Sequence, residues 1–291
     1  DLDLKNNQIK RLTYPSIHFD ILSLNIGSIS NNRSLKIDGL SNCINVKPIS
    51  DLVNQLSKID DIVSQNIDSC ISIVGGGIAS YEISFSLKQR YLDSVKINII
   101  GDNQLSEKNI NQFSKKKLGK IAEQMGINII EDRVEQIKTD HLVLASNKSI
   151  KSNLNLLSTG ADISPWLAKT ELLKSKSGFI AVNKYLQSQN FEDVFVTGDI
   201  AEVSGYKRVK SGVMAVRQGQ ILKKNLFLKF QNKNMVKFKA QQNWLYLIGT
   251  YNNKAILNYY FISVHSRWSW YLKVLIDQRF IRKFSFPNKK S

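Results

Sequence analysis

A glycine-rich turn between a strand and a helix is the part of this sequence whose residue types and spacing could do chemistry. Gly75-Gly76-Gly77-Ile78-Ala79-Ser80 has the spacing G-x-G-x-x-S and directly follows the apolar segment 70–74. The first glycine of such a turn permits a tight reversal, and the second lets the backbone approach a pyrophosphate at the positive end of the helix. The third position normally allows close helix–strand packing, and Ser80 is a small replacement there. The pattern predicts a dinucleotide site, with a glycine turn that binds nothing as the alternative.

A carboxylate that accepts hydrogen bonds from the ribose of a dinucleotide is expected about 20 residues after the turn, at the end of the second strand. Asp102 is the candidate, but Gly101 occupies the strand end itself. Asp102 is equally well interpreted as a surface turn residue. The sequence therefore leaves the choice between NAD and NADP open.

A second glycine turn follows the apolar segment 194–196. A carboxylate such as Asp199 at a strand end accepts hydrogen bonds from the polyol hydroxyls of a cofactor, and Gly198 allows close approach. The next helix is predicted to begin near Ser211, Gly212 and Val213, where its dipole would stabilise negative charge on a bound ring. Because Gly-Asp is a common turn, an ordinary surface turn is the alternative interpretation.

The surrounding elements indicate an α/β fold. Segments 70–74 and 95–100 are predicted strands, and the helix between them extends to about Leu92, which makes a β–α–β unit typical of parallel sheets. Other strands are predicted at 19–28, 127–130, 134–137, 141–145, 154–160, 178–182 and 194–199. Other helices are predicted at 49–62, 107–125, 211–230 and 267–284. Segments 244–251 and 254–261 flank Asn252-Asn253, a good hairpin turn.

Composition excludes several classes of protein. The formal net charge of +17 attracts polyanions, but the lysines are spread along the chain without a recognition motif, so no nucleic-acid partner is predicted. Two Cys and three isolated His exclude a disulfide-rich scaffold and a four-cysteine zinc site, and no metal site is predicted. Without an apolar run of roughly 20 residues or a signal peptide, the expected compartment is the cytoplasm.

The order of these pieces resembles the pyridine nucleotide–disulfide oxidoreductase superfamily. A closer resemblance is to the type II NADH dehydrogenase-like, FAD-containing domain found fused ahead of selenide,water dikinase; its segments are 22–28, 46–49, 160–168, 178–182, 215–219 and 270–280. The resemblance implies two Rossmann-like domains, with the NAD(P) domain inserted in the FAD domain, plus a C-terminal hairpin and amphipathic helix. The implied boundaries are 1–46 (FAD domain), 47–156 (NAD(P) domain), 157–232 (FAD domain) and 233–291 (C-terminal region).

The resemblance also implies roles for individual residues and two cofactors, FAD and NAD(P)H. Hydride would pass from NAD(P)H to FAD and on to an unknown acceptor, a reaction that needs no catalytic side chain. The dinucleotide would be held by Gly75, Gly76, Gly77, Ser80 and Glu82, and the FAD ribityl and phosphate side by Gly198 and Asp199. Gly212 and Val213 would approach the flavin pyrimidine, and Gly27 and Gly160 would be crossover turns.

Departures from the family pattern are also visible. The superfamily's first G-x-G-x-x-G is absent and is expected upstream of Asp1, so we expect an N-terminally incomplete fragment. Without a C-x-x-C, the disulfide reductase branch is excluded. The two glutamines that line the quinone site of type II NADH dehydrogenases fall at Val213 and Arg217, so quinone reduction is left open.

Two other hypotheses stay open. One is a degenerate scaffold that keeps the fold to interact with a partner such as a fused or associated selenide,water dikinase. The other is peripheral membrane contact through the helix at 267–284, which combines an apolar stripe with basic residues. For that helix, packing of the stripe on its own domain is the alternative.

Overall fold

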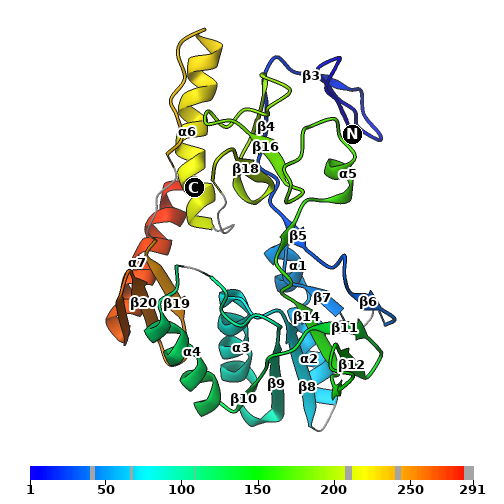
Figure 1. The fold of residues 1–291 in the computed structure, drawn as a ribbon, viewed down its shortest axis with the longest axis vertical. Helices are drawn as coiled ribbons and strands as arrows, with labels where there is room; N and C mark the ends of the chain where they lie inside the picture. Colours follow the sequence, from blue (N-terminus) through cyan, green and yellow to red (C-terminus); the bar gives the residue numbers. More distant parts are fainter. Residues whose placement is uncertain (40–42, 66–67, 108, 207–211, 240–243, 285–291) are drawn as a thin grey trace, which may run out of the picture. The chain divides into compact units, whose positions relative to one another are not determined.

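The computed structural model describes residues 1–39, 43–65, 68–107, 109–206, 212–239 and 244–284 (Figure 1). The chain forms two compact units. The first unit comprises residues 1–31, 47–50 and 160–241, and the second comprises residues 32–46, 51–159 and 242–291. Of the C-terminal region 233–291 predicted from the sequence, residues 242–291 belong to the unit that contains the first glycine turn, and residues 233–241 belong to the first unit.

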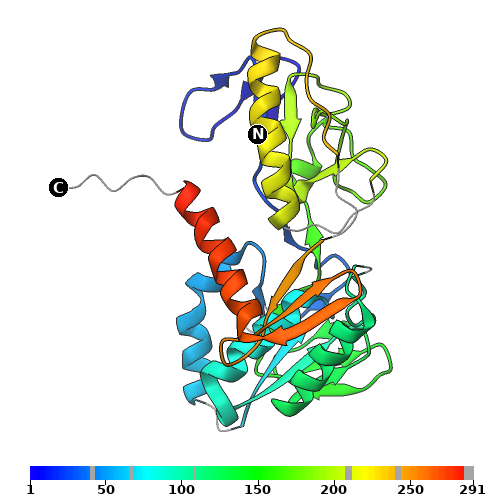
Figure 2. The same ribbon diagram turned by 90° about the vertical axis from the view of Figure 1, so that its left-hand side faces the viewer.

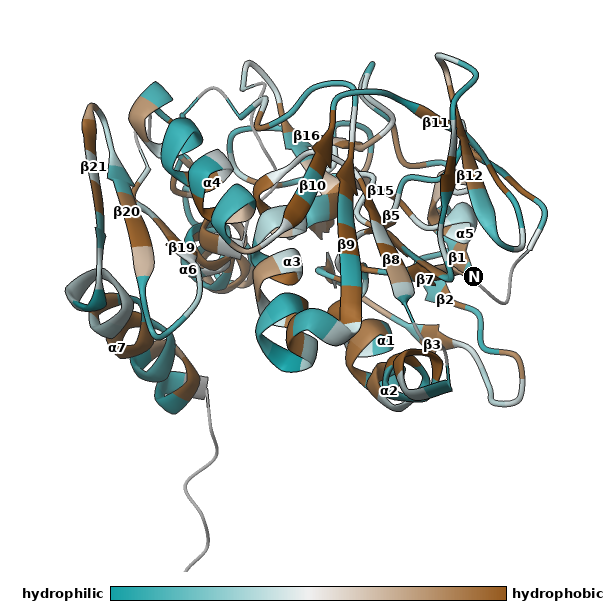
Figure 3. Cartoon of the chain, turned by 90° about the horizontal axis from the view of Figure 1, so that it is seen from below, coloured by the Kyte–Doolittle hydropathy of each residue, from teal (hydrophilic) through white to brown (hydrophobic). Residues whose placement is uncertain are grey.

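A five-stranded parallel sheet forms the centre of the second unit. Its strands, in spatial order, are β10 (Ile127–Ile130), β9 (Val95–Ile100), β8 (Ser69–Val74), β14 (Leu154–Leu157) and β7 (Cys43–Asn45). Every residue of β8 and β14 is buried, as expected for parallel strands covered on both faces. Apolar colouring dominates β9 and β10 in Figure 3. The predicted parallel α/β architecture is confirmed.

Helices α3 (Ile78–Tyr91) and α4 (Gln112–Gln124) connect the strands of this sheet and pack on β9 and β10 respectively (Figure 1). Phe85 of α3 is completely buried and packs with the isoleucines of β8 and β9. The 3₁₀ turn η2 (Leu92–Ser94) ends α3, and α2 (Leu56–Gln65) contributes Ile59 to the same core.

Two predicted helices begin or divide differently in the structure. The helix expected over 49–62 is two helices, α1 (Ile49–Asn54) and α2, with a break at Gln55. The helix expected over 107–125 begins only at Gln112, because Asn111 caps it by accepting a hydrogen bond from the Ser114 amide at 2.8 Å. Residues 101–107 instead lie against the glycine turn, where Leu105 and Glu107 form hydrogen bonds. Ser211, the predicted start of a later helix, lies outside the described residues.

A four-stranded sheet lies in the same unit, in the order β13-β12-β11-β6. Its strands are β13 (Ser149–Lys151), β12 (His141–Leu144), β11 (Val134–Ile137) and β6 (Lys36–Ile37). β6 falls in a segment for which the sequence predicted no strand; it pairs in parallel with β11.

The C-terminal part of the second unit is a three-stranded antiparallel sheet followed by a helix. Its elements are β19 (Tyr246–Gly249), β20 (Ala255–Tyr259), β21 (Ile262–Ser266) and α7 (Arg267–Phe284). Asn252 and Asn253 both have positive φ, which confirms the predicted hairpin. A second turn, with Tyr260 at φ 49°, leads to β21, which the sequence did not predict. Figure 2 shows α7 lying beside β20 and β21.

The first unit is built from short strands and one long helix. β4 (Leu22–Leu24) pairs in parallel with β17 (Val194–Val196), and β16 (Ile180–Val182) pairs in parallel with β18 (Ala201–Val203). The remaining elements are β1 (Leu2–Asp3), β2 (Gln8–Ile9), β3 (Ile17–His18), β5 (Ile29–Ser30), β15 (Ala161–Asp162), α5 (Pro165–Ala168), η3 (Gly198–Ile200) and α6 (Gly212–Phe230).

Asn258 attaches the C-terminal sheet to the rest of its unit, and its loss should destabilise that unit. The side chain is fully buried; it accepts from the Asn111 amide at 2.9 Å and donates to the Asn109 carbonyl at 2.9 Å. Asn258→Ala leaves both groups unpaired, so we expect the free energy of unfolding to fall by about 1–3 kcal/mol. Urea unfolding followed by tryptophan fluorescence measures this.

The control is Asn252→Gly in the turn between β19 and β20, where glycine accepts the positive φ. It should change stability by less than about 0.5 kcal/mol. Equal stability of the two variants would contradict the bridging role of Asn258.

Candidate functional site

The turn from β8 to α3 requires glycine at Gly75. Its φ is +132°, and a Cβ there would overlap the carbonyl oxygen of Ser158. The Gly75 amide donates to the Ile100 carbonyl at 2.7 Å, and the Ser158 amide donates to the Val74 carbonyl at 2.9 Å. The turn is therefore packed tightly against the carboxyl ends of the neighbouring strands β9 and β14.

The first turn of α3 presents backbone amides beside this glycine turn. Gly77 is the N-cap residue, has extended backbone and offers no side chain to cap the helix. Ser80 is completely buried, and its hydroxyl has no hydrogen-bond partner in the described part of the chain. Ser80 thus takes the close-packing position that glycine usually occupies in the fingerprint.

The segment after β9 lies directly on the glycine turn, which the sequence did not predict. The Leu105 amide donates to the Gly76 carbonyl at 2.7 Å. The side-chain Nε2 of Gln104 donates to the Gly101 carbonyl at 3.1 Å, and the Tyr81 hydroxyl donates to Oε1 of Gln104 at 3.3 Å. Burial raises the pKa of Tyr81 to about 12, so the phenol remains a donor at neutral pH.

Glu107 in this segment caps α3 from outside the helix. Its Oε1 accepts a hydrogen bond from the Ile78 amide at 3.1 Å, and its Oε2 is buried without a partner among the described residues. The helix predicted over 107–125 includes Glu107, but the residue lies before the start of α4. The sequence feature that could have indicated this contact is the presence of an acidic residue in the segment after the second strand.

The predicted ribose partner lies at the edge of this arrangement. Gly101 is buried, and a Cβ at that position would lie 2.6 Å from the Gly76 amide nitrogen, so position 101 has no room for a side chain. Asp102, the next residue, is exposed. Its ribose-binding role remains a prediction.

Glu82 lies on α3 but binds the C-terminal sheet. Its Oε1 accepts a hydrogen bond from the Gly249 amide at 2.8 Å. Trp270 and Lys273 of α7 also lie within van der Waals distance of a Cβ placed at Gly249. In the structure, then, this carboxylate links α3 to β19.

The second predicted cofactor region, in the first unit, centres on Asp199. Its Oδ2 accepts from Lys47 Nζ at 2.8 Å and from Ser28 Oγ at 3.1 Å. Lys47 also donates to Ser28 at 3.3 Å, so the three side chains form one network. Lys47 and Ser28 were absent from the predicted site, although both fall in segments that carried the family resemblance.

Gly198 permits a close approach of side chains to this turn. Its φ is +74°, and a Cβ there would lie 2.5 Å from Oδ1 of Asn25. The Gly198 amide donates to Gln218 of α6 at 2.6 Å. Thr197 Oγ1 is buried without a partner in the described residues, which leaves one polar atom for a ligand.

The other predicted positions in the first unit are more exposed. Gly27 and Gly160 have φ of +72° and +92° and precede β5 and β15, which pair antiparallel. Gly212 and Val213 are the first two residues of α6, and 49% of Val213 is exposed. No hydrogen bond found among the described residues joins these four positions into one site.

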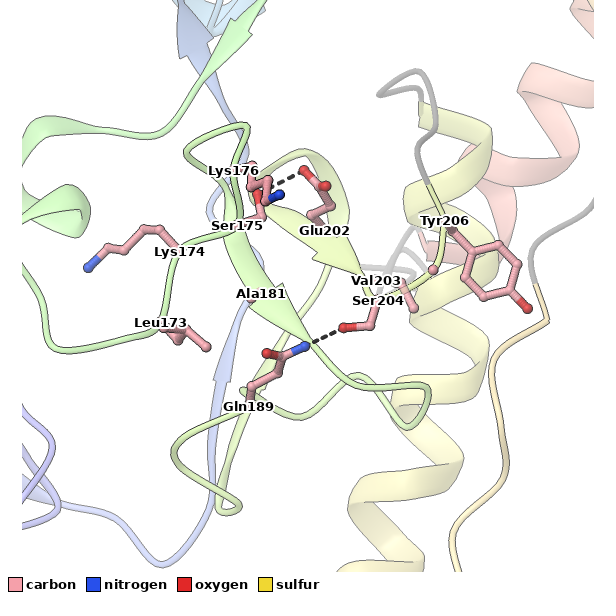
Figure 4. Close-up of a pocket in the computed structure, with 11 residues that line it drawn as sticks. Leu173, Lys174, Ser175, Lys176, Ala181, Gln189, Glu202, Val203, Ser204 and Tyr206 are labelled. Atoms are coloured by element: carbon pink, nitrogen blue, oxygen red, sulfur yellow. Dashed lines mark hydrogen bonds between the residues drawn. The ribbon is translucent and has the colours of Figure 1, made fainter.

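A separate pocket of about 750 Å³ lies in the first unit, lined by residues of 173–176, 181, 189 and 202–206 (Figure 4). Ser175 donates to Glu202 at 2.9 Å on one side, and Gln189 donates to Ser204 on the other. None of the predicted cofactor residues lines it. Within the described ranges, no three His, Cys, Asp or Glu side chains are grouped so as to hold a metal ion.

The sequence profile of a family described as pyridine nucleotide-disulphide oxidoreductase matches residues 5–219. The chain belongs to this family. The match includes both glycine turns described above. It ends within α6, before the C-terminal sheet and α7.

Curated relatives match this chain at low sequence identity. The chain is 23% identical over 214 residues to human ferroptosis suppressor protein 1, covering 69% of this chain and 55% of that protein. It is 26% identical over 168 residues to the mitochondrial internal alternative NAD(P)H-ubiquinone oxidoreductase A1 of Solanum tuberosum, covering 52% of this chain and 33% of the potato protein. The matched region therefore spans between a third and about half of these relatives.

Several solved structures share the fold of this chain. NDH2 from Plasmodium falciparum, in complex with NADH, has a TM-score of 0.76 at 15% identity, covering 96% of this chain and 78% of that one. The sulfide:quinone oxidoreductase of Aquifex aeolicus has a TM-score of 0.73 at 14% identity, covering 97% and 73%. The two-domain Rossmann-like fold class predicted from the sequence is confirmed.

The half-buried Glu82 should make stability depend on pH. Burial raises the pKa of Glu82, and the Gly249 amide offsets this only partly. A carboxyl whose pKa is higher in the folded chain destabilises the fold progressively as pH rises above the unfolded value of about 4.3. Glu82→Gln removes this titration and keeps an oxygen for Gly249.

We therefore expect the stability of Glu82→Gln relative to wild type to increase between about pH 4 and about pH 7. Urea unfolding at several pH values measures it. The control is Glu123→Gln, on the exposed face of α4. A difference between Glu82→Gln and wild type that is constant across pH would show that Glu82 does not titrate as described.

Proposed function

We propose that this protein is an FAD-dependent NAD(P)H oxidoreductase in which hydride passes from NAD(P)H to FAD and then to an acceptor. The observation that carries the proposal is the tight β8–α3 glycine turn within a chain that belongs to the pyridine nucleotide-disulphide oxidoreductase family. The names of the potato relative and the Plasmodium structure, which include NAD(P)H and NADH, support the same chemistry.

The residues present fit NAD(P)H and FAD in part. Gly75, Gly76 and Gly77 with the first amides of α3 would hold a dinucleotide pyrophosphate, because a Cβ-free turn beside a helix N-terminus fits an anion. Gly198 and the network of Asp199, Lys47 and Ser28 would bind hydroxyl and phosphate groups of FAD. When bound, FAD supplies the two-electron chemistry, and these residues bind and orient.

The finer parts of the proposal rest on the sequence resemblance. We propose that the acceptor is reduced in connection with a selenide,water dikinase, fused or associated, in the cytoplasm. The C-terminal segment 270–280 carries part of that resemblance and forms part of α7.

A non-catalytic scaffold is the second candidate function. Two observations favour it: position 101 has no room for a ribose-binding acid, and Glu107 already bonds the Ile78 amide. In this candidate the fold serves to bind a partner protein, and the nucleotide sites are vestigial.

A reduction experiment on the full-length protein separates these candidates. The purified protein should carry a visible flavin spectrum that bleaches when NADH or NADPH is added without oxygen. Asp199→Asn removes the charge from the FAD network and should weaken FAD binding by about tenfold or more. Asp93→Asn, at an exposed ion pair with Lys88, is the matched control.

Retained flavin affinity in Asp199→Asn would contradict the assignment of that network. A protein without flavin, or one whose flavin does not bleach, would favour the scaffold.

Helix α7 supports an additional proposal, contact with an anionic membrane surface. Exposed fractions are 82% for Trp268, 61% for Tyr271 and 52% for Leu275, so much of the predicted apolar stripe is left uncovered. The helix also carries the basic residues Arg267, Lys273, Arg279, Arg282 and Lys283. No helix among the described residues has the length and apolar character needed to cross a bilayer, so contact would be at the surface.

Vesicle sedimentation tests the membrane proposal. The protein should bind vesicles that contain phosphatidylglycerol and not vesicles of pure phosphatidylcholine, and high salt should release it. Trp268→Ser should lower the partition coefficient by about tenfold, because an exposed indole no longer enters the interface. Phe113→Ser, an exposed aromatic position on α4, is the control. Equal binding of both variants and wild type would overturn the proposal.

A further inference from the structure

The N-terminus of α3, where the proposed function places a pyrophosphate, is already in contact with a carboxylate of the same chain. Glu107 Oε1 lies 3.1 Å from the Ile78 amide nitrogen and would lie 3.1 Å from a Cβ on Gly77. The carboxylate therefore lies directly over Gly77, a position of the glycine fingerprint that has no side chain. A negative group is attracted there because the first amides of a helix carry partial positive charge.

The second oxygen of this carboxylate has no compensating bond. Glu107 Oε2 is buried and has no hydrogen-bond partner in the described part of the chain. Burial of an unpaired carboxylate oxygen is unfavourable. Glu107 is therefore held by the helix N-terminus and by its own backbone rather than by a complete set of side-chain partners, which is what a displaceable group requires.

The backbone that carries Glu107 is fixed to the glycine turn. The Leu105 backbone amide donates to the Gly76 carbonyl at 2.7 Å. The side-chain Nε2 of Gln104 donates to the carbonyls of Gly101 and Ile130 at 3.1 and 3.3 Å. Gly101 makes this approach possible, since any side chain there would meet the Gly76 amide at 2.6 Å. Segment 101–107 thus forms a cover over the turn.

We propose that Glu107 occupies the pyrophosphate position of the dinucleotide site and must be displaced before NAD(P)H binds, so that segment 101–107 acts as an autoinhibitory cover. This inference rests on the proposed function. Pyrophosphate and the Glu107 carboxylate compete for the Ile78 amide, and pyrophosphate displaces the carboxylate only at sufficient concentration. The wild-type protein therefore binds NAD(P)H more weakly than its glycine turn alone would allow.

Equilibrium binding of NADH to the full-length protein tests the inference. Glu107→Gln keeps the size of the side chain and an oxygen for the Ile78 amide, and removes the charge. We expect its Kd for NADH to be about 5- to 30-fold lower than that of wild type. Glu123→Gln on the exposed face of α4 is the matched control and should leave the Kd unchanged.

Inorganic pyrophosphate is a second probe that does not depend on the nicotinamide. It should raise the melting temperature of Glu107→Gln more than that of wild type, because a neutral amide oxygen competes less strongly for the Ile78 amide than a carboxylate does. Equal thermal stability of the unliganded variant and wild type would verify that both are folded alike.

The outcomes separate the inference from the proposed function. A lower Kd in Glu107→Gln supports both. Measurable NADH binding with the same Kd in wild type and variant overturns the cover and leaves the proposed function intact. If NADH binds neither protein but pyrophosphate selectively stabilises the variant, the result supports a cover over an anion site and contradicts the assignment of NAD(P)H to that site. If neither probe distinguishes the variant, the inference is wrong.

Discussion

The contact between Gly75 and the Ser158 carbonyl is the constraint on which the arrangement of the second unit depends. It holds the turn after β8 against the end of β14, and the bond from the Gly75 amide to Ile100 holds the same turn against β9. Three parallel strands therefore end at one place, and α3 begins there. A residue with a Cβ at Gly75 would move the helix away from the sheet and with it the amides that define the candidate site.

The close packing of the glycine turn on β9 and β14 also explains why this site is covered by another segment of the chain. With the turn pressed onto the strand ends, the chain leaving β9 at Gly101 runs directly over Gly76 and has no room for a side chain. The segment therefore lies on the turn, and Glu107 accepts a hydrogen bond from the Ile78 amide. The missing ribose acid and the capping glutamate are thus two consequences of one close packing. The Asp199 network of the first unit shows a related feature, since Lys47 already pairs with the predicted cofactor carboxylate.

Sequence patterns predicted most of the framework and little of the side-chain chemistry. The buried strands Ser69–Val74 and Val95–Ile100 were predictable because apolar runs follow directly from burial. Helix α7 was predictable from the helical spacing of its apolar stripe, although much of that stripe is exposed in the structure. The late start of α4 and the extra strand β21 were missed, because a cap at Asn111 and a positive φ at Tyr260 are local features that periodicity does not report. Lys47 and Glu107 could not be predicted because they meet their partners across 152 and 29 residues of chain.

Amide hydrogen exchange with and without NADH tests the central claim, that the dinucleotide binds at the N-terminus of α3, most directly. The account predicts that saturating NADH slows exchange in the peptide that contains Gly75–Ser80, because the pyrophosphate accepts hydrogen bonds from the first amides of α3. It also predicts faster exchange in the peptide that contains Leu105 and Glu107, since the cover must move. NADH binding that leaves both peptides unchanged, and protects another part of the chain, would contradict the account.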